Sequence, residues 1–250
     1  IILILFFVYM VWKSLRAAKI QKDLAQQAKQ EIEFKNTEIL DSIKYAKRIQ
    51  EALLRDDRGR QDLPPHFTYY QPKDIVSGDF YWSYRNDNYW YVAAADCTGH
   101  GVPGAMLTML GNAYLNELCA KGQNPEPAEL LDQLKKKITA ELSQSGEKGG
   151  SKDGMDISLV KIDLKAIKAT WAGANNPLYI IQNDELKELK GNKQPIGYSE
   201  KVDPFVNHDL DIQNGDHIYL FSDGYADQFG GEKGKKFKYS NFKKLLMDTR

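Results

Sequence analysis

The chain has 250 residues, 42% of them hydrophobic, which is enough for one buried core and an additional segment. Its 34 basic and 34 acidic residues cancel, so it lacks the positive charge by which an enzyme acting on nucleic acid attracts its substrate. The two cysteines, Cys97 and Cys119, suggest neither a metal-ligand pair nor a disulfide framework, which fits a reducing cytoplasm.

Residues 1–12 form an uninterrupted apolar run, and Lys13 and Arg16 follow it closely. The run is shorter than the ~20 residues that span a bilayer, so we interpret it as the end of a transmembrane helix that begins before this sequence. The basic residues after it predict an inner-membrane protein whose remaining chain is cytoplasmic. A signal peptide is disfavoured because the run has no basic start and no small-residue cleavage site. A buried helix remains an alternative.

Residues 13–54 are polar and contain neither glycine nor proline, which predicts one long helix. An apolar stripe recurs at every seventh position, whereas the companion stripe of a coiled coil is mostly polar. We predict a weak coiled-coil signalling helix and a homodimer. A single helix packed on the following domain is nearly as well supported for the last third of the segment. The stripe consists of Ile4, Val11, Ala18, Ala25, Ile32, Ile39, Ala46 and Leu53.

Residues 55–63 are mostly charged and are predicted to be a linker, and two prolines then open a domain over residues 64–250. Helical and strand patterns alternate irregularly there, which indicates an α+β fold with mixed sheets and helices outside them. The hydrophobic periodicity predicts helices over 101–121 and 128–142 and another from about residue 239. Strands are expected over 89–95, 156–163, 168–172, 177–181, 186–189 and 217–221, with a hairpin turn at 183–184.

Three aspartates in this domain stand next to glycines: Asp79 in Ser-Gly-Asp, Asp96 before Cys-Thr-Gly, and Asp223 in Ser-Asp-Gly. Glycine permits the tight turns in which carboxylate and backbone oxygens close around a hard cation such as Mg²⁺ or Mn²⁺. The pattern therefore predicts a metal-dependent hydrolase centre. An isolated Gly-Asp usually caps a turn, so the metal role depends on the three motifs occurring together.

Other polar residues have weaker claims to a role at such a site. Asp156 is interpreted as structural, because strand alternation can point it at solvent or at a capping partner. His100 lies between two glycines, where it either fixes a turn or donates to a phosphate. Asn175 and Asn176 are expected to organise a turn.

Four segments together resemble the SpoIIE-type branch of the protein phosphatase 2C superfamily: residues 77–82, 96–105, 172–177 and 221–224. Their order and spacing match over about residues 64–250, and four motifs in register are far more specific than one. Residues 42–53 are similar to the helix that leads into such domains in membrane-bound sensor proteins.

The resemblance implies a four-layer αββα sandwich, in which helices flank two antiparallel sheets, and a serine/threonine phosphatase with two Mn²⁺ or Mg²⁺ ions. It assigns Asp79 and Asp96 as metal ligands, the backbone carbonyl of Cys97 to the second metal and Asp223 to the first. Water activated by the metals would attack phosphorus directly, without a covalent phosphoenzyme. The implied partner is a phosphorylated protein, with a small anti-sigma-factor antagonist as a natural substrate class.

The family pattern is incomplete at the end of the chain. Similar phosphatases close with an Asp-Asp pair that leads into a final strand, and its acid supplies another ligand to the first metal. This sequence ends at Asp248-Thr249-Arg250 inside a predicted helix, so we expect the 250-residue chain to bind the first metal poorly. We therefore expect a phosphatase domain over 64–250 that is truncated at its C-terminus, with regulation arriving through the N-terminal helix. The alternative is a non-catalytic, membrane-tethered signalling module that binds a phosphorylated partner.

Overall fold

The computed structural model describes residues 1–54, 63–144, 152–200, 203–232 and 234–249. The chain divides into two units, Ile1–Ala46 and Lys47–Arg250. The predicted linker over 55–63 lies outside the described residues except for its last position, Leu63, which is buried.

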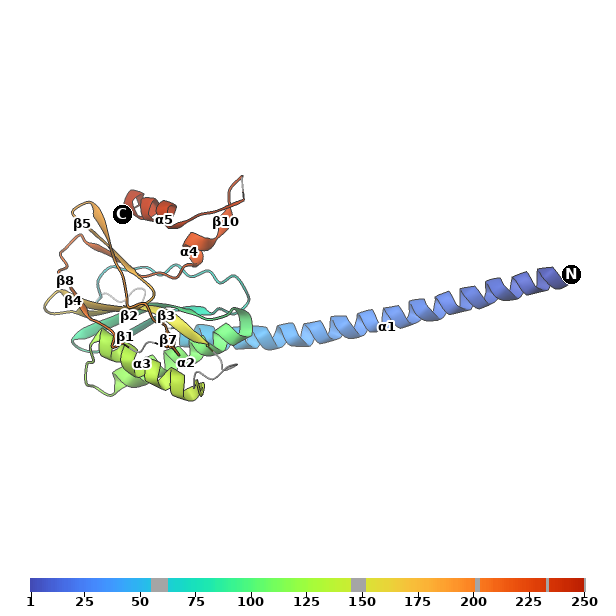
Figure 1. The fold of residues 1–250 in the computed structure, drawn as a ribbon, viewed down its shortest axis with the longest axis horizontal. Coiled ribbons are helices and arrows are strands. Elements are labelled where there is room, and N and C mark those ends of the chain that lie inside the picture. Colours follow the sequence, from blue (N-terminus) through green and yellow to red (C-terminus); the bar gives the residue numbers. More distant parts are fainter. Residues whose placement is uncertain (55–62, 145–151, 201–202, 233, 250) are drawn as a thin grey trace. The chain divides into compact units, whose positions relative to one another are not determined.

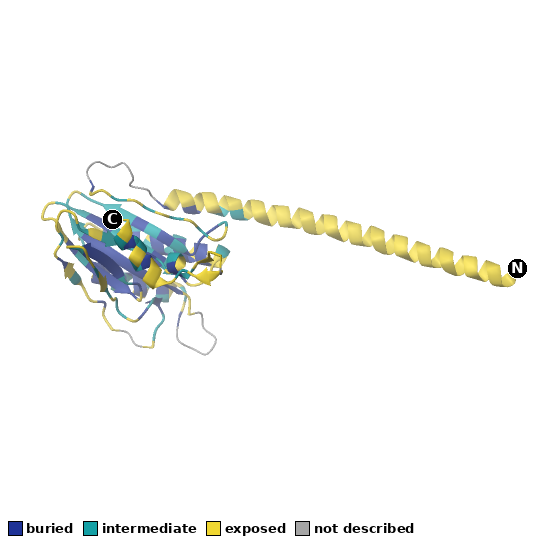
Figure 2. Cartoon of the chain, turned by 90° about the horizontal axis from the view of Figure 1, so that it is seen from above, coloured by how far each residue is buried: buried dark blue, intermediate teal, exposed yellow. Residues whose placement is uncertain are grey.

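A single helix, α1 (Ile2–Leu53), forms the first unit as far as Ala46, and its residues from Lys47 onward belong to the second unit. The predicted helix over 13–54 is thus present, because the segment combines strong helix formers with no glycine or proline. Figure 2 shows α1 exposed along almost its whole length. Ion pairs one turn apart, such as Lys29 with Glu33 at 3.8 Å, stabilise the exposed helix slightly. In the described part of the chain, no helix has an apolar stretch long enough to cross a membrane.

The second unit contains a six-stranded sheet in which all neighbouring strands are antiparallel (Figure 1). The strand order is β1-β2-β3-β4-β8, and β7 pairs with β3. The bounds are β1 (Asp79–Arg85), β2 (Tyr89–Cys97), β3 (Gly154–Asp163), β4 (Lys168–Ala174), β7 (Ile196–Gly197) and β8 (His208–Leu210).

A second antiparallel sheet has the order β6-β5-β9, with β5 (Leu178–Gln182), β6 (Glu185–Leu189) and β9 (His217–Tyr219). The predicted hairpin turn between β5 and β6 is confirmed. Asn183 and Asp184 both have positive φ, 50° and 65°, as a two-residue turn of this kind requires. A separate pair, β10 (Phe229–Gly230) and β11 (Lys235–Lys236), forms a small ribbon.

Helices α2 (Gly101–Ala120) and α3 (Pro127–Glu141) pack on the six-stranded sheet (Figure 1). The predicted spans of both helices are confirmed to within one residue. The core beneath them includes Leu115, Leu130 and Ile157, each fully buried. On its opposite face the same sheet packs on the second sheet, where Trp171 and Ile180 belong to one cluster.

The last helices are α4 (Gly224–Asp227) and α5 (Tyr239–Asp248), and the predicted start of a helix near residue 239 is confirmed. Phe242 of α5 packs with Tyr179 and Ile181 of β5. The expected α+β class with antiparallel sheets and helices is therefore observed. The complete four-layer sandwich stays a prediction, because the second sheet has only three strands among the described residues.

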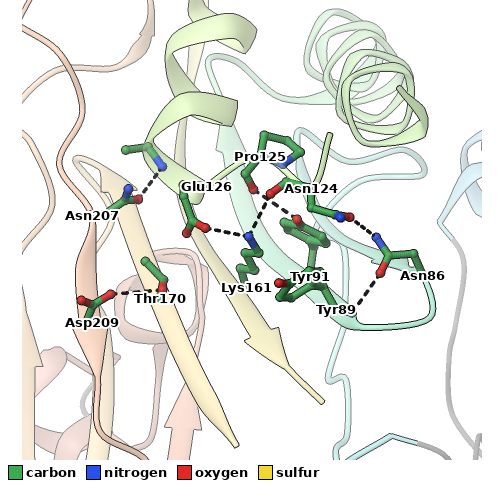
Figure 3. Close-up of polar contacts among 11 residues, drawn as sticks. Asn86, Tyr89, Tyr91, Asn124, Pro125, Glu126, Lys161, Thr170, Asn207 and Asp209 are labelled. Carbon is green, nitrogen blue, oxygen red and sulfur yellow. Dashed lines mark hydrogen bonds and ion pairs between the residues drawn. The ribbon is translucent and has the colours of Figure 1, made fainter. Parts of the chain in front are cut away.

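A buried lysine makes several polar contacts near one end of the six-stranded sheet (Figure 3). Lys161 of β3 donates to Glu126 Oε1 at 2.7 Å and to Asn124 O at 2.9 Å. Its Nζ lies 4.2 Å from the ring centroid of Tyr89, a cation-π contact. These contacts join β3 to the segment that leads into α3. Lys161 lies near the C-terminal end of β3, whereas the acidic residues described below lie near the N-terminal end of that strand.

Candidate metal centre

Three aspartates form a row across neighbouring strands of the six-stranded sheet. In the antiparallel register, Asp79 of β1 lies opposite Asp96 of β2, and Asp96 lies opposite Asp156 of β3. Directly opposite residues project from the same face of a sheet with their β-carbons about 4.5–5.5 Å apart. The glycine motifs predict Asp79 and Asp96 as site residues, whereas the strand pattern around Asp156 favours a structural role for it.

The fourth aspartate, Asp223, reaches the row from the other side of the fold, where it follows β9 of the second sheet. Its neighbour Ser222 donates its hydroxyl hydrogen to Asp79 Oδ2, with an oxygen-oxygen distance of 2.6 Å. The structure therefore brings Asp79, Asp96 and Asp223 together, although 127 positions separate the last two in the sequence (223 minus 96).

Burial and neighbouring negative charges raise the pKa values of two of these carboxylates, Asp96 and Asp223. Burial raises the pKa of Asp96 to about 8, and the negative charges of Asp79, Asp223 and Asp156 add to this effect. Burial also raises the pKa of Asp223, followed by the charges of Asp227 and Asp79. Like charges held this close favour protonation of one of them, and a bound divalent cation would relieve the repulsion.

The residues fit a hard divalent cation by the chemistry of their donor atoms, which are carboxylate and backbone carbonyl oxygens. They are not arranged as a finished coordination sphere, since no group of three or more His, Cys, Asp or Glu side chains within the described ranges has the spacing to hold an ion. The oxygen donors are therefore close to one another, but their side chains are not oriented to coordinate an ion.

Glycines allow the two motifs that carry Asp79 and Asp96 to approach each other closely. A β-carbon at Gly78 would lie 2.5 Å from the carbonyl oxygen of Gly99, well inside van der Waals contact. The amide of Cys97 donates to Gly78 O at 3.2 Å, which couples the two turns through the backbone. Hence any side chain at position 78 must separate the turns that present the acids.

The predicted contribution of Cys97 is its carbonyl oxygen, and its side chain is unsuited to chemistry. The thiol is buried against Thr108, and burial raises its pKa to about 12. Such a thiol stays neutral and unreactive at physiological pH.

A glutamine at the end of α1 holds the turn that precedes Asp79, and the sequence analysis missed it. Gln50 is 3% exposed; its Nε2 donates to Ser77 O at 2.7 Å, and its Oε1 accepts from Ser77 N at 3.0 Å. Thr108 of α2 donates to Gly78 O at 2.9 Å. The only signal in the sequence was a polar residue on the apolar face of the helix, between Ile49 and Leu53.

The remaining candidates have defined contacts. His100 is largely exposed, and its Nδ1 lies 2.9 Å from Asp74 Oδ2. The prediction that the two asparagines organise a turn is confirmed: Asn175 has φ 55°, and the side chain of Asn176 donates to Phe221 O at 2.8 Å.

The chain is similar to known proteins in sequence and in fold. The family model of stage II sporulation protein E (SpoIIE) matches residues 86–249. Phosphoserine phosphatase RsbU of Bacillus subtilis (strain 168) is 23% identical over 209 residues, which cover 82% of this chain and 59% of RsbU. The chain therefore spans about three fifths of that relative's length.

Two solved structures are similar in fold. The SiaA-PP2C domain of Pseudomonas aeruginosa has a TM-score of 0.74 and 32% identity, with 85% of this chain and 83% of that chain covered. A structure of the PP2C phosphatase domain and a fragment of the regulatory domain of SpoIIE from Bacillus subtilis has a TM-score of 0.54 at 17% identity, covering 70% and 47%. The family model matches well over half of the residues, and the matched range includes Asp96, Asp156 and the Ser-Asp-Gly turn but not Asp79. The chain belongs to the SpoIIE-type branch of the protein phosphatase 2C superfamily.

Proposed function

We propose that the chain is a metal-dependent phosphatase that removes phosphate from phosphoserine or phosphothreonine on a partner signalling protein. The observation that carries this proposal is the convergence of Asp79, Asp96 and Asp223 from two sheets onto one place. Membership of the family supports the reaction, and the relative named phosphoserine phosphatase supports the substrate class.

Asp79 and Asp96 would hold two Mn²⁺ or Mg²⁺ ions, the Cys97 carbonyl would bind the second ion and Asp223 the first. When bound, two such ions lower the pKa of water and offset the negative charge that develops on the phosphoryl group. The protein's own residues provide the placement: the Ser77-Gly78 turn fixes Asp79, and Ser222 orients its Oδ2. Hydrolysis of a phosphomonoester depends mainly on such positioning and electrostatics, which explains why the motifs are rich in acids and glycines.

The test is phosphate release from a phosphoserine peptide by the 250-residue chain with and without Mn²⁺. We expect turnover that requires the metal and that is lost in Asp96→Asn. Folded protein that binds the phosphopeptide but releases no phosphate at any Mn²⁺ concentration would instead favour the non-catalytic binding module.

Regulation through the N-terminal helix belongs to the same proposal. The contact that supports it is the pair of hydrogen bonds between Gln50, at the end of α1, and Ser77, two residues before Asp79. A change in the helix that moved Gln50 would move the turn that presents a metal ligand. Charged substitutions at Ile39 and Ala46, in the apolar stripe, are expected to change turnover, whereas Gln26→Glu outside the stripe is not. Unchanged turnover in the stripe variants would contradict the coupling.

The proposed setting is the inner membrane, with residues 1–12 as the end of a membrane anchor and the catalytic unit in the cytoplasm. Members of the apolar stripe such as Ile32 and Ile39 are exposed, which supports pairing of two helices in a homodimer. A phosphorylated anti-sigma-factor antagonist is the proposed substrate class, by the family resemblance. Sedimentation of the chain across a range of concentrations tests the dimer.

A further inference from the structure

Asp156 faces the same space as the predicted metal ligands. Its strand neighbours Met155 and Ile157 are buried in the core beneath α2 and α3, so alternation directs Asp156 to the opposite face of the sheet. Asp96 also lies between residues of that core, Ala95 and Cys97. The aspartate row therefore projects toward the second sheet, from which Asp223 arrives.

One turn holds Asp156 and also the segment that leads to Asp223. Asn175 Nδ2 donates to Asp156 Oδ1 at 2.8 Å, and the backbone amide of Asn175 donates to Asn192 O. The next residue, Asn176, is 8% exposed and donates to Phe221 O, two residues before Asp223. The turn at Asn175 and Asn176 thus fixes the position of Asp156 relative to Asp223.

The second carboxylate oxygen of Asp156, Oδ2, accepts no hydrogen bond from any residue that the structure describes, and within the same residues the carboxylate forms no salt bridge. Hard divalent cations take about six oxygen ligands each, and the three predicted aspartates with one carbonyl leave positions open at both ions.

We propose that Asp156 is a fourth carboxylate of the metal centre, which binds a divalent cation through Oδ2 beside Asp223, and that Asn175 is a positioning residue for it. This inference rests on the proposed function, because it needs a cation at the aspartate row. It replaces the structural interpretation of Asp156 given by the sequence.

The test is calorimetric titration of Mn²⁺ into the 250-residue chain and into Asp156→Asn. The asparagine oxygen can still accept from Asn175, so the variant removes the charge while keeping that contact. We expect at least about tenfold weaker binding, which corresponds to ~1.4 kcal/mol. The matched control is Asp209→Asn in β8, whose carboxylate likewise accepts one side-chain hydrogen bond, from Thr170 at 3.2 Å. That control should bind Mn²⁺ like the unmodified chain.

A double-mutant cycle tests the role of Asn175. Asn175→Ala should weaken Mn²⁺ binding, but it should add little further loss in the Asp156→Asn background, because its effect is exerted through Asp156. A purely structural asparagine would give additive losses. If Asp156→Asn fails to fold, Mn²⁺ affinity is measured for Asp156→Glu and Asn175→Ala instead. Asp156→Glu should keep most of the affinity, and Asn175→Ala should lose it.

Two outcomes separate this inference from the proposed function. Equal Mn²⁺ affinity of the unmodified chain and folded Asp156→Asn overturns the inference alone. An unmodified chain that neither binds Mn²⁺ nor releases phosphate overturns the inference and the proposed function together.

Discussion

Gln50→Ala should destabilise the second unit by about 2–3 kcal/mol. The substitution removes both hydrogen bonds to Ser77, each worth about 1 kcal/mol for neutral groups. It also leaves the buried Ser77 amide without its Gln50 partner, which costs about 1 kcal/mol or more. Ser77 O keeps a bond from Thr108, at 3.1 Å, and alanine's better helix propensity offsets a few tenths of a kcal/mol.

Urea denaturation followed by circular dichroism measures this loss as a lower transition midpoint with an unchanged dependence on urea concentration. Gln27→Ala, at an exposed position of α1, is the matched control and should change stability by less than about 0.5 kcal/mol. If Gln50→Ala were as mild as this control, the two hydrogen bonds would not hold the Ser77 turn, and the route from α1 to Asp79 would lose its basis.

Three further predictions test the site and its surroundings. Gly78→Ala should lower the free energy of unfolding by about 1–3 kcal/mol and weaken Mn²⁺ binding, because the added β-carbon would lie 2.5 Å from Gly99 O. Gly230→Ala is the control, since its β-carbon would have no atom within 4 Å, and it should change neither the melting temperature nor the Mn²⁺ affinity measured by calorimetry. In EDTA, the free energy of unfolding should fall as pH rises from about 4 to about 8, because folding raises the pKa of Asp96 and the folded state must give up that proton. Asp96→Asn should flatten this dependence, and an equal slope in both proteins would refute it. Lys161→Met should lower the free energy of unfolding, measured by urea denaturation, by about 1–3 kcal/mol, and it should leave Mn²⁺ affinity unchanged. A loss of Mn²⁺ affinity in this variant would contradict a purely structural role of Lys161.

Most long elements could be predicted from the sequence because their periodicity is strong. The strands expected over 89–95 and 156–163 are β2 and β3, each of which is two residues longer at one end. The strand expected over 217–221 is shorter, since β9 ends at Tyr219. The sequence did not predict β1. It also did not predict β7, β8, β10 and β11, whose two or three residues are too few to show a period of their own.

The candidate site was predictable only where a local motif signalled it. Asp79, Asp96 and Asp223 each stand beside a glycine turn, so the sequence marked them. Asp156 has no such mark: its place beside Asp96 follows from the register of β2 with β3, and a shift of one residue would turn it to the other face. Gln50 was missed for a related reason, because only the packed structure shows that a polar side chain on a helix meets the backbone of residue 77.

The central claim is that the aspartate row and Asp223 form a divalent metal centre. Crystals of the chain soaked in Mn²⁺ test it most directly, through an anomalous difference map calculated from data at a wavelength where manganese scatters anomalously. We expect anomalous peaks within coordination distance of Asp79, Asp96 and Asp223, about 2.0–2.4 Å from their oxygens. A well-ordered site without a peak, or with peaks only elsewhere on the protein, would contradict it.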